Sequence, residues 1–168
     1  MFTIGNREMI KSIIALGLML SLTGCAGMMA EQQAKQQSSY DDLSKCEPVK
    51  IDSTNAEPSK DLLVSRLLSS ALSASSDAFI ADTKIKTLQL VGWNEKVSND
   101  IITCRVDRRK ARIDSIKPIF ESVKMQTKDK DEKKALVEAY SSWEAYQMSL
   151  TSAAKQDFDT KISYYKNM

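Results

Sequence analysis

The chain has 168 residues, and its 24 Lys and Arg against 22 Asp and Glu give a formal net charge of only +2. This near balance argues against a nucleic-acid-binding protein, because phosphate binding needs a clear excess of positive charge. The sequence contains no histidine, which excludes Ser-His-Asp and Cys-His catalysis and every histidine-liganded metal site.

Residues 1–24 have the organisation of an export signal. Arg7 and Lys11 precede a short apolar run at residues 13–20. A positive segment followed by such a run is typical of a signal peptide, and the run is shorter than the roughly 20 apolar residues that span a bilayer. Met9 is an alternative start that would leave out the acidic Glu8. We expect residues 1–24 to be removed on export.

The apolar run ends at Leu22-Thr23-Gly24-Cys25, which resembles the lipobox of bacterial lipoproteins. The resemblance covers only the first 25 residues. It implies that the Cys25 sulfur receives a diacylglyceryl group, that the chain is cut before Cys25, and that a fatty acid such as palmitate is added to the new N-terminus. It also implies a cell-envelope protein anchored in the outer membrane and facing the periplasm, because Ala26 rather than Asp follows the cysteine.

Such an anchor holds without a transmembrane helix. Each buried methylene contributes about 0.8 kcal/mol, so two or three acyl chains on Cys25 bind a membrane almost permanently. We therefore expect the protein to bind a membrane through the lipid on Cys25 alone.

Lipidation of Cys25 would leave Cys46 and Cys104 as a pair. Outside the cytoplasm such a pair is expected to oxidise. The disulfide would close a loop of about 59 residues and stabilise the fold by roughly 4 kcal/mol. The alternative is that Cys104 is a small core residue and Cys46 is free. We predict the disulfide.

Residues 25–58, here called the tether, are rich in Gln, Ser, Lys and Asp and contain few large apolar residues. This composition is typical of a linker, although the first half contains good helix formers and is compatible with a short exposed helix. The sequence therefore predicts a polar tether followed by a folded domain at residues 59–168.

The folded domain is expected to begin with a helix that starts near Ser59 and stops at Gly92. Ser59 is a good N-cap residue, and glycine commonly ends helices. Apolar residues recur at steps of three and four, as in an amphipathic helix. They are Leu63, Leu67, Ala71, Ala74 and Ala78, and Leu68, Leu72 and Phe79 are expected to widen this stripe. The periodicity weakens at residues 83–86, so a short strand over 85–91 is an alternative.

A second helix is predicted to start at Asn94 or Ser98 and to run as far as the polar segment 127–134. Pro118 lacks an amide donor and is expected to kink or split this helix. The predicted apolar line of this helix contains Val97, Ile101, Cys104, Val106, Ile113, Ile116, Phe120 and Val123.

A third helix is predicted to follow as one long segment that ends near the C-terminus. Its apolar line contains Leu136, Tyr140, Trp143, Tyr146 or Gln147, Leu150, Ala154, Phe158, Ile162 and Tyr165. Three helices of about 30 residues with short connections favour an all-α fold. We expect an elongated antiparallel three-helix bundle, with four helices if Pro118 divides the middle one.

Four arginines form a candidate binding patch on the second predicted helix. Arg105, Arg108, Arg109 and Arg112 fall on one side of a helical wheel. The patch would suit anionic lipid head groups, cell-wall polymers or an acidic partner. The same spacing is equally typical of an ordinary solvated helix face, so both interpretations stay open.

Tyr140, Trp143 and Tyr146 are spaced three residues apart. The spacing is compatible with a strip that stacks on a ligand, but aromatic residues at helical spacing are more commonly core residues. We predict that they belong to the core.

Nothing in the sequence points to catalysis. It contains no glycine-rich phosphate loop, serine nucleophile motif or calcium loop, and no spacing brings two carboxylates together. We expect a non-enzymatic protein without cofactor or metal, which acts as an interaction or accessory factor for an envelope protein. The alternative is a helical module that binds a lipid or a cell-wall fragment.

Overall fold

The structure is a computed structural model, and it describes residues 31–49 and 56–168. The chain divides into two compact units, one up to Leu43 and one from Ser44 to Met168. In the first unit, residues from 31 onward are helical, which is the alternative that the helix formers in the first half of the tether left open. Cys25 and the predicted signal peptide lie outside the described residues.

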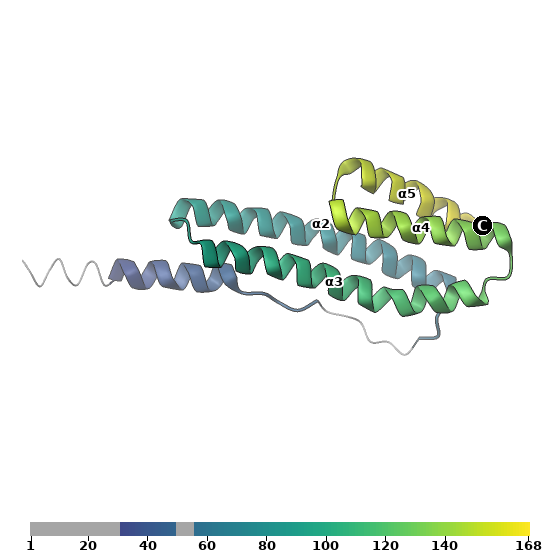
Figure 1. Cartoon of the computed structure of the whole chain (residues 1–168), viewed down its shortest axis with the longest axis horizontal. Coiled ribbons are helices and arrows are strands. Elements are labelled where there is room, and N and C mark those ends of the chain that lie inside the picture. Colours follow the sequence, from purple (N-terminus) through teal and green to yellow (C-terminus); the bar gives the residue numbers. More distant parts are fainter. Residues whose placement is uncertain (1–30, 50–55) are drawn as a thin grey trace, which may run out of the picture. The chain divides into compact units, whose positions relative to one another are not determined.

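The second unit is all-α, which confirms the predicted fold class. It contains α2 (Lys60–Val91), α3 (Glu95–Gln126), α4 (Lys130–Ser149) and α5 (Ser152–Asn167). Figure 1 shows that α2 and α3 form a long antiparallel hairpin. The shorter hairpin of α4 and α5 packs over the half of the first hairpin that lies away from the α2–α3 turn.

The ends of α2 and the start of α3 follow from local capping. The Ser59 side chain accepts a hydrogen bond from the Leu62 amide at 3.2 Å. Gly92 ends α2 with a φ of 120°, a value that glycine adopts without steric conflict. The Asn94 side chain accepts from the Val97 amide at 3.1 Å and so caps α3. Since α2 continues to Val91, the alternative strand over residues 85–91 is wrong.

The structure has a fourth helix in the bundle, but Pro118 does not create it. α3 continues through Pro118, which lies on the exposed side of the helix. Ile116 and Phe120, on either side of the proline, are both buried in the core and hold the two parts of α3 on the same neighbours.

The extra helix comes instead from a break in the third predicted segment. Leu150 adopts a left-handed conformation with a φ of 51°, and its amide donates to the Tyr146 carbonyl at 2.8 Å. Thr151 then caps α5 by accepting a hydrogen bond from the Ala154 amide at 3.3 Å. The break folds α5 back and buries Phe158 and Tyr165 in the same core as α4, which a straight helix would not do.

The core lies where both hairpins meet, and it contains the three aromatic residues of α4. Tyr140, Trp143 and Tyr146 are all buried, which confirms the core interpretation. The Phe120 and Tyr140 rings stack with their centroids 3.8 Å apart, and the Tyr146 and Phe158 rings are 6.4 Å apart. In the part of the chain that the structure describes, no helix is long and apolar enough to cross a membrane.

Candidate functional site

The structure separates the four arginines of the predicted patch into two pairs. Arg112 is buried, with 4% of its surface exposed, and Arg108 is half-buried. Both form ion pairs with Asp77 of α2. Arg105 and Arg109 are also half-buried but form no ion pair within residues 31–49 and 56–168. Arg108 and Arg112 therefore do not lie on a solvated face with Arg105 and Arg109, because a buried carboxylate on the neighbouring helix pairs with them.

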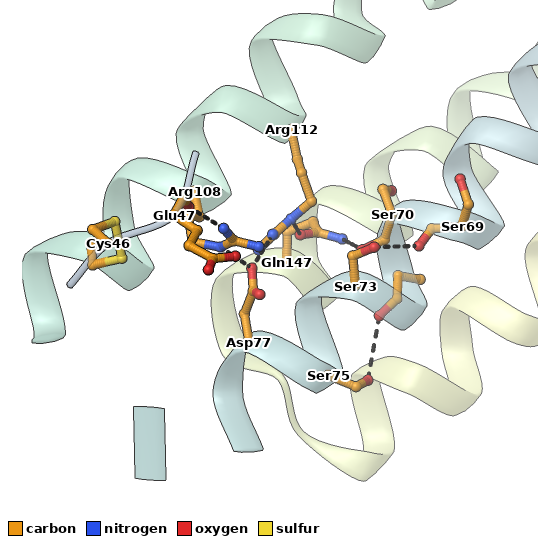
Figure 2. A network of polar contacts seen from close by, with 12 residues as sticks. Cys46, Glu47, Ser69, Ser70, Ser73, Ser75, Asp77, Arg108, Arg112 and Gln147 are labelled. Atoms are coloured by element: carbon orange, nitrogen blue, oxygen red, sulfur yellow. Dashed lines mark hydrogen bonds and ion pairs between the residues drawn. A yellow bond between two sulfur atoms is a disulfide. The ribbon is translucent and has the colours of Figure 1, made fainter. Parts of the chain in front are cut away.

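A chain of polar contacts, here called the Asp77 network, crosses α2, α3 and α4 (Figure 2). Arg108 donates from Nε to the Asp77 carboxylate at 2.9 Å, and Arg112 donates from Nη1 to the same oxygen. Arg112 also donates from Nε to the Gln147 side-chain oxygen at 3.2 Å. Gln147 in turn donates to the Ser70 carbonyl at 3.4 Å. The network thus connects α2, α3 and α4 by side-chain contacts.

The network also extends into the aromatic core. The Trp143 indole N–H donates to the Ser70 hydroxyl at 2.8 Å, and this hydroxyl donates to the Leu67 carbonyl at 3.0 Å. The buried polar groups of this layer therefore have hydrogen-bond partners, which is the condition under which buried polar groups are tolerated. The layer therefore fixes the register of the helices that it joins.

The charge state of Asp77 follows from its neighbours. Burial by itself would raise the pKa of Asp77, but the hydrogen bonds and charges of Arg108 and Arg112 outweigh it and hold this pKa below its usual value. Asp77 is therefore ionised at neutral pH, and the layer carries two positive charges against one negative charge.

Asp77 and Gln147 are site residues that sequence reasoning does not single out. The available signal is the position of Asp77 in the helical sequence, between Ala74 and Ala81 on the buried side of α2. An acidic residue in an apolar line requires a buried partner. For Gln147 the signal is its position, which shares the apolar line of the third predicted helix with Tyr146, and both residues are buried.

The disulfide lies beside this network. Cys46 and Cys104 are bonded, with their Cα atoms 5.5 Å apart, as predicted. The Arg108 guanidinium also donates to the Glu47 carbonyl, and the Lys84 ammonium donates to the Lys45 carbonyl at 2.7 Å. Residues 45–47 of the tether are therefore held by both α2 and α3 within the second unit.

A second feature is the half of the α2–α3 hairpin that α4 and α5 do not cover (Figure 1). On α3, Ile102 and Val106 are 54% and 42% exposed, whereas Ile116 and Phe120 further along are 3% and 5% exposed. Arg105 and Arg109 lie beside the two exposed apolar residues on the helical wheel. We call Ile102, Arg105, Val106 and Arg109 the uncovered face.

The aromatic residues considered for ligand stacking do not form an open strip. Trp143 and Phe158 are fully buried. An open depression beside the α4–α5 turn is lined by Tyr146, Leu150 and polar residues of α5, among them Lys155, which is paired with Asp159. Among the residues that the structure describes, no three Cys, Asp or Glu side chains are placed to hold a metal ion.

Comparison of the chain with protein-family models, with curated proteins and with solved structures finds no match.

Proposed function

We propose that the protein is a lipid-anchored lipoprotein of the bacterial cell envelope that acts without catalysis, as an interaction or accessory factor for another envelope protein. The disulfide between Cys46 and Cys104 carries this proposal. Disulfides persist in oxidising compartments such as the periplasm and are rare in the cytosol. The bond also accounts for two of the three cysteines, which leaves Cys25 as the residue available for lipid.

The sequence around Cys25 supports the same location. Leu22-Thr23-Gly24-Cys25 follows a basic segment and a short apolar run, as in a lipoprotein signal. Ala26 after the cysteine favours the outer membrane, with the helical domain facing the periplasm.

The proposed mode of action is contact between helix surfaces. The bundle carries large apolar side chains on its outside, of which Leu72 and Phe79 on α2 are 69% and 73% exposed. Together with the uncovered face of α3, they leave apolar surface exposed outside the core of the domain. Such surface supports a docking role.

Metabolic labelling with an alkyne analogue of palmitate tests the lipid anchor. In a Gram-negative host that expresses the full chain, we expect the label on the wild-type protein and none on Cys25→Ser, because only the Cys25 sulfur starts the modification. Inhibiting the lipoprotein signal peptidase should make the uncut precursor accumulate.

The matched control is the double variant Cys46→Ser with Cys104→Ser, which removes the other two cysteines and should keep the label. A wild-type protein without label, or a Cys25→Ser protein that retains it, would contradict the proposal.

A further inference from the structure

We propose that the uncovered face of α3 binds an amphipathic helix of a partner protein, with acidic residues beside its apolar stripe. This inference rests on the proposed function and names the surface and the partner's chemistry. It depends on four residues, Ile102, Arg105, Val106 and Arg109, and on the half of α2 that lies beside them.

The first argument is continuity with the packing inside the bundle. The uncovered face continues along α3, at steps of three and four residues, to Ile113, Ile116 and Phe120. Ile116 and Phe120 belong to the core, and Phe120 stacks on Tyr140 of α4. Because α4 ends at Ser149, the same apolar line goes on without a covering helix from the second unit. A helix from another chain can therefore extend the packing that α4 begins.

The α2 half of the hairpin has a matching line. Leu67 and Ala71 are buried in the core beside α4, and the same helical side continues to Ala78 and Ile85, which are only half-buried. The small Ala78 side chain allows a helix to approach closely. The apolar lines of α2 and α3 together form a binding surface for one helix. This is the usual arrangement when an amphipathic helix binds between two others.

The second argument is charge. Arg108 and Arg112 form ion pairs with Asp77, but Arg105 and Arg109 have no ion pair in the described part of the chain. Guanidinium groups bind carboxylates through two parallel N–H donors. Pairs formed beside Ile102 and Val106 would be partly shielded from water, where they contribute more than fully exposed pairs. The partner helix is therefore expected to carry Asp or Glu next to its apolar stripe.

The charge also argues against a second copy as the occupant. A twofold dimer through this face would place the same arginines on both sides of the interface. Asp82 is the acidic residue that α2 exposes nearest to its own matching line, so each copy would offer one carboxylate for two guanidinium groups. An acidic helix from a different protein removes this mismatch.

The length of the surface limits the size of the partner segment. The uncovered part of α3 begins at Glu95 and reaches about Arg109, which corresponds to roughly 22 Å of helix. A partner helix of about four turns would fill it. Its apolar contacts should repeat at steps of three and four residues.

Site-specific photocrosslinking in bacterial cells tests the proposal with the full chain. A photoreactive residue at Val106 should capture one partner, and mass spectrometry should map the adduct to a helix with Asp or Glu beside an apolar stripe. Probes at Met125 on α3 and Phe79 on α2, which are 76% and 73% exposed, serve as controls and should not capture that helix.

Charge reversal then tests the arginines. Arg105→Glu with Arg109→Glu should lower the Val106 adduct at least about tenfold, and Lys substitutions at the mapped acidic residues of the partner should restore it. Lys117→Glu with Lys128→Glu makes the same change at two exposed lysines and should leave the adduct unchanged. If the Glu variant unfolds, which circular dichroism detects, Arg105→Gln with Arg109→Gln provides the same test with a smaller change.

The outcomes separate this inference from the proposed function. An adduct between two copies of the chain, an adduct that ignores arginine reversal, or adducts only at Phe79 or Met125 would overturn the inference and leave the accessory role intact. Absence of any adduct at all three positions would overturn both. Loss of the palmitate label would count against the lipid anchor alone.

Discussion

Asp77 lies in the apolar line of α2, and its position decides the roles of Arg108 and Arg112. A carboxylate that is 8% exposed needs positive partners, and the two arginines reach it from α3. Replacing a whole buried ion pair by apolar residues is commonly neutral, but removing one partner costs about 3–5 kcal/mol because the other charge stays buried. The Asp77 network therefore fixes the register of α2, α3 and α4 relative to one another.

We expect Asp77→Asn to lower the free energy of unfolding by about 3 kcal/mol at pH 7, since it leaves Arg112 buried without a counter-charge. The effect should depend on pH. The pKa of Asp77 is lower in the folded protein than its ordinary value of 3.8, so its contribution is complete above that value and is lost as the pH falls through the folded pKa.

Urea unfolding followed by circular dichroism between pH 7 and about pH 3 measures both effects. Below pH 3.8, the ordinary pKa of an aspartate, the wild type should lose stability more steeply than Asp77→Asn. Asp107→Asn, a matched change at an exposed position of α3, should behave like the wild type. Equal losses in the wild type and Asp77→Asn would rule out the proposed role of Asp77.

The sequence could place the four arginines on one side of α3 but could not assign their roles. A helical wheel shows which residues share a side of one helix, and it does not show which helix packs there. Arg112 and Gln147 are 35 residues apart in the sequence and meet only in the folded bundle. By contrast, the pairing of Cys46 with Cys104 was predictable, because export and an odd cysteine count left one pair to form.

At the scale of helices, the turn at Leu150 converts one predicted helix into the α4–α5 hairpin. The apolar spacing continues across the turn, through Leu150, Ala154 and Phe158, so periodicity alone gives no sign that the chain reverses. The signal that was present is Thr151, a residue type that starts helices. The helix ends at Ser59, Gly92 and Asn94 were predictable for the same local reason.

We expect Thr151→Ala to lower the free energy of unfolding by about 1 kcal/mol, because the Ala154 amide at the start of α5 loses its acceptor. Thr160→Ala, in the middle of the same helix, removes a hydroxyl that bonds only to the Gln156 carbonyl, and it should change stability by less than about 0.5 kcal/mol. Thermal unfolding of the two variants makes the comparison. A Thr160 effect equal to that of Thr151 would show that capping does not set the turn.

At the scale of the whole second unit, the disulfide joins Cys46 of the tether to Cys104 in the N-terminal part of α3. Its cysteines are 58 residues apart in the sequence, and the bond therefore restricts a long loop in the unfolded chain. The Glu47 and Lys45 carbonyls add contacts to Arg108 and Lys84 next to the bond. The bond and these contacts together tie the N-terminal part of the unit to the hairpin.

We expect Cys46→Ser with Cys104→Ser to lower the free energy of unfolding by roughly 4 kcal/mol, as the loop length predicts. Urea unfolding of the mature protein in detergent, with and without a dithiol reductant, measures the loss. The reductant should destabilise the wild type to a similar extent and should not affect the double variant. A wild type that unfolds identically with and without the reductant would be inconsistent with a stabilising bond.

The disulfide also determines where mechanical load enters the bundle. If lipid on Cys25 holds the protein at a membrane, a pull on the domain reaches α3 through Cys104 and does not reach the first turn of α2 at Ser59. Opening the bond would move the attachment point from Cys104 to Ser59. The chain between the lipid and the domain would then be longer by about 13 residues, or at most roughly 45 Å when extended. With the lipid anchor in place, the redox state of Cys46 and Cys104 would set how far the domain can extend from the membrane and which helix is pulled first.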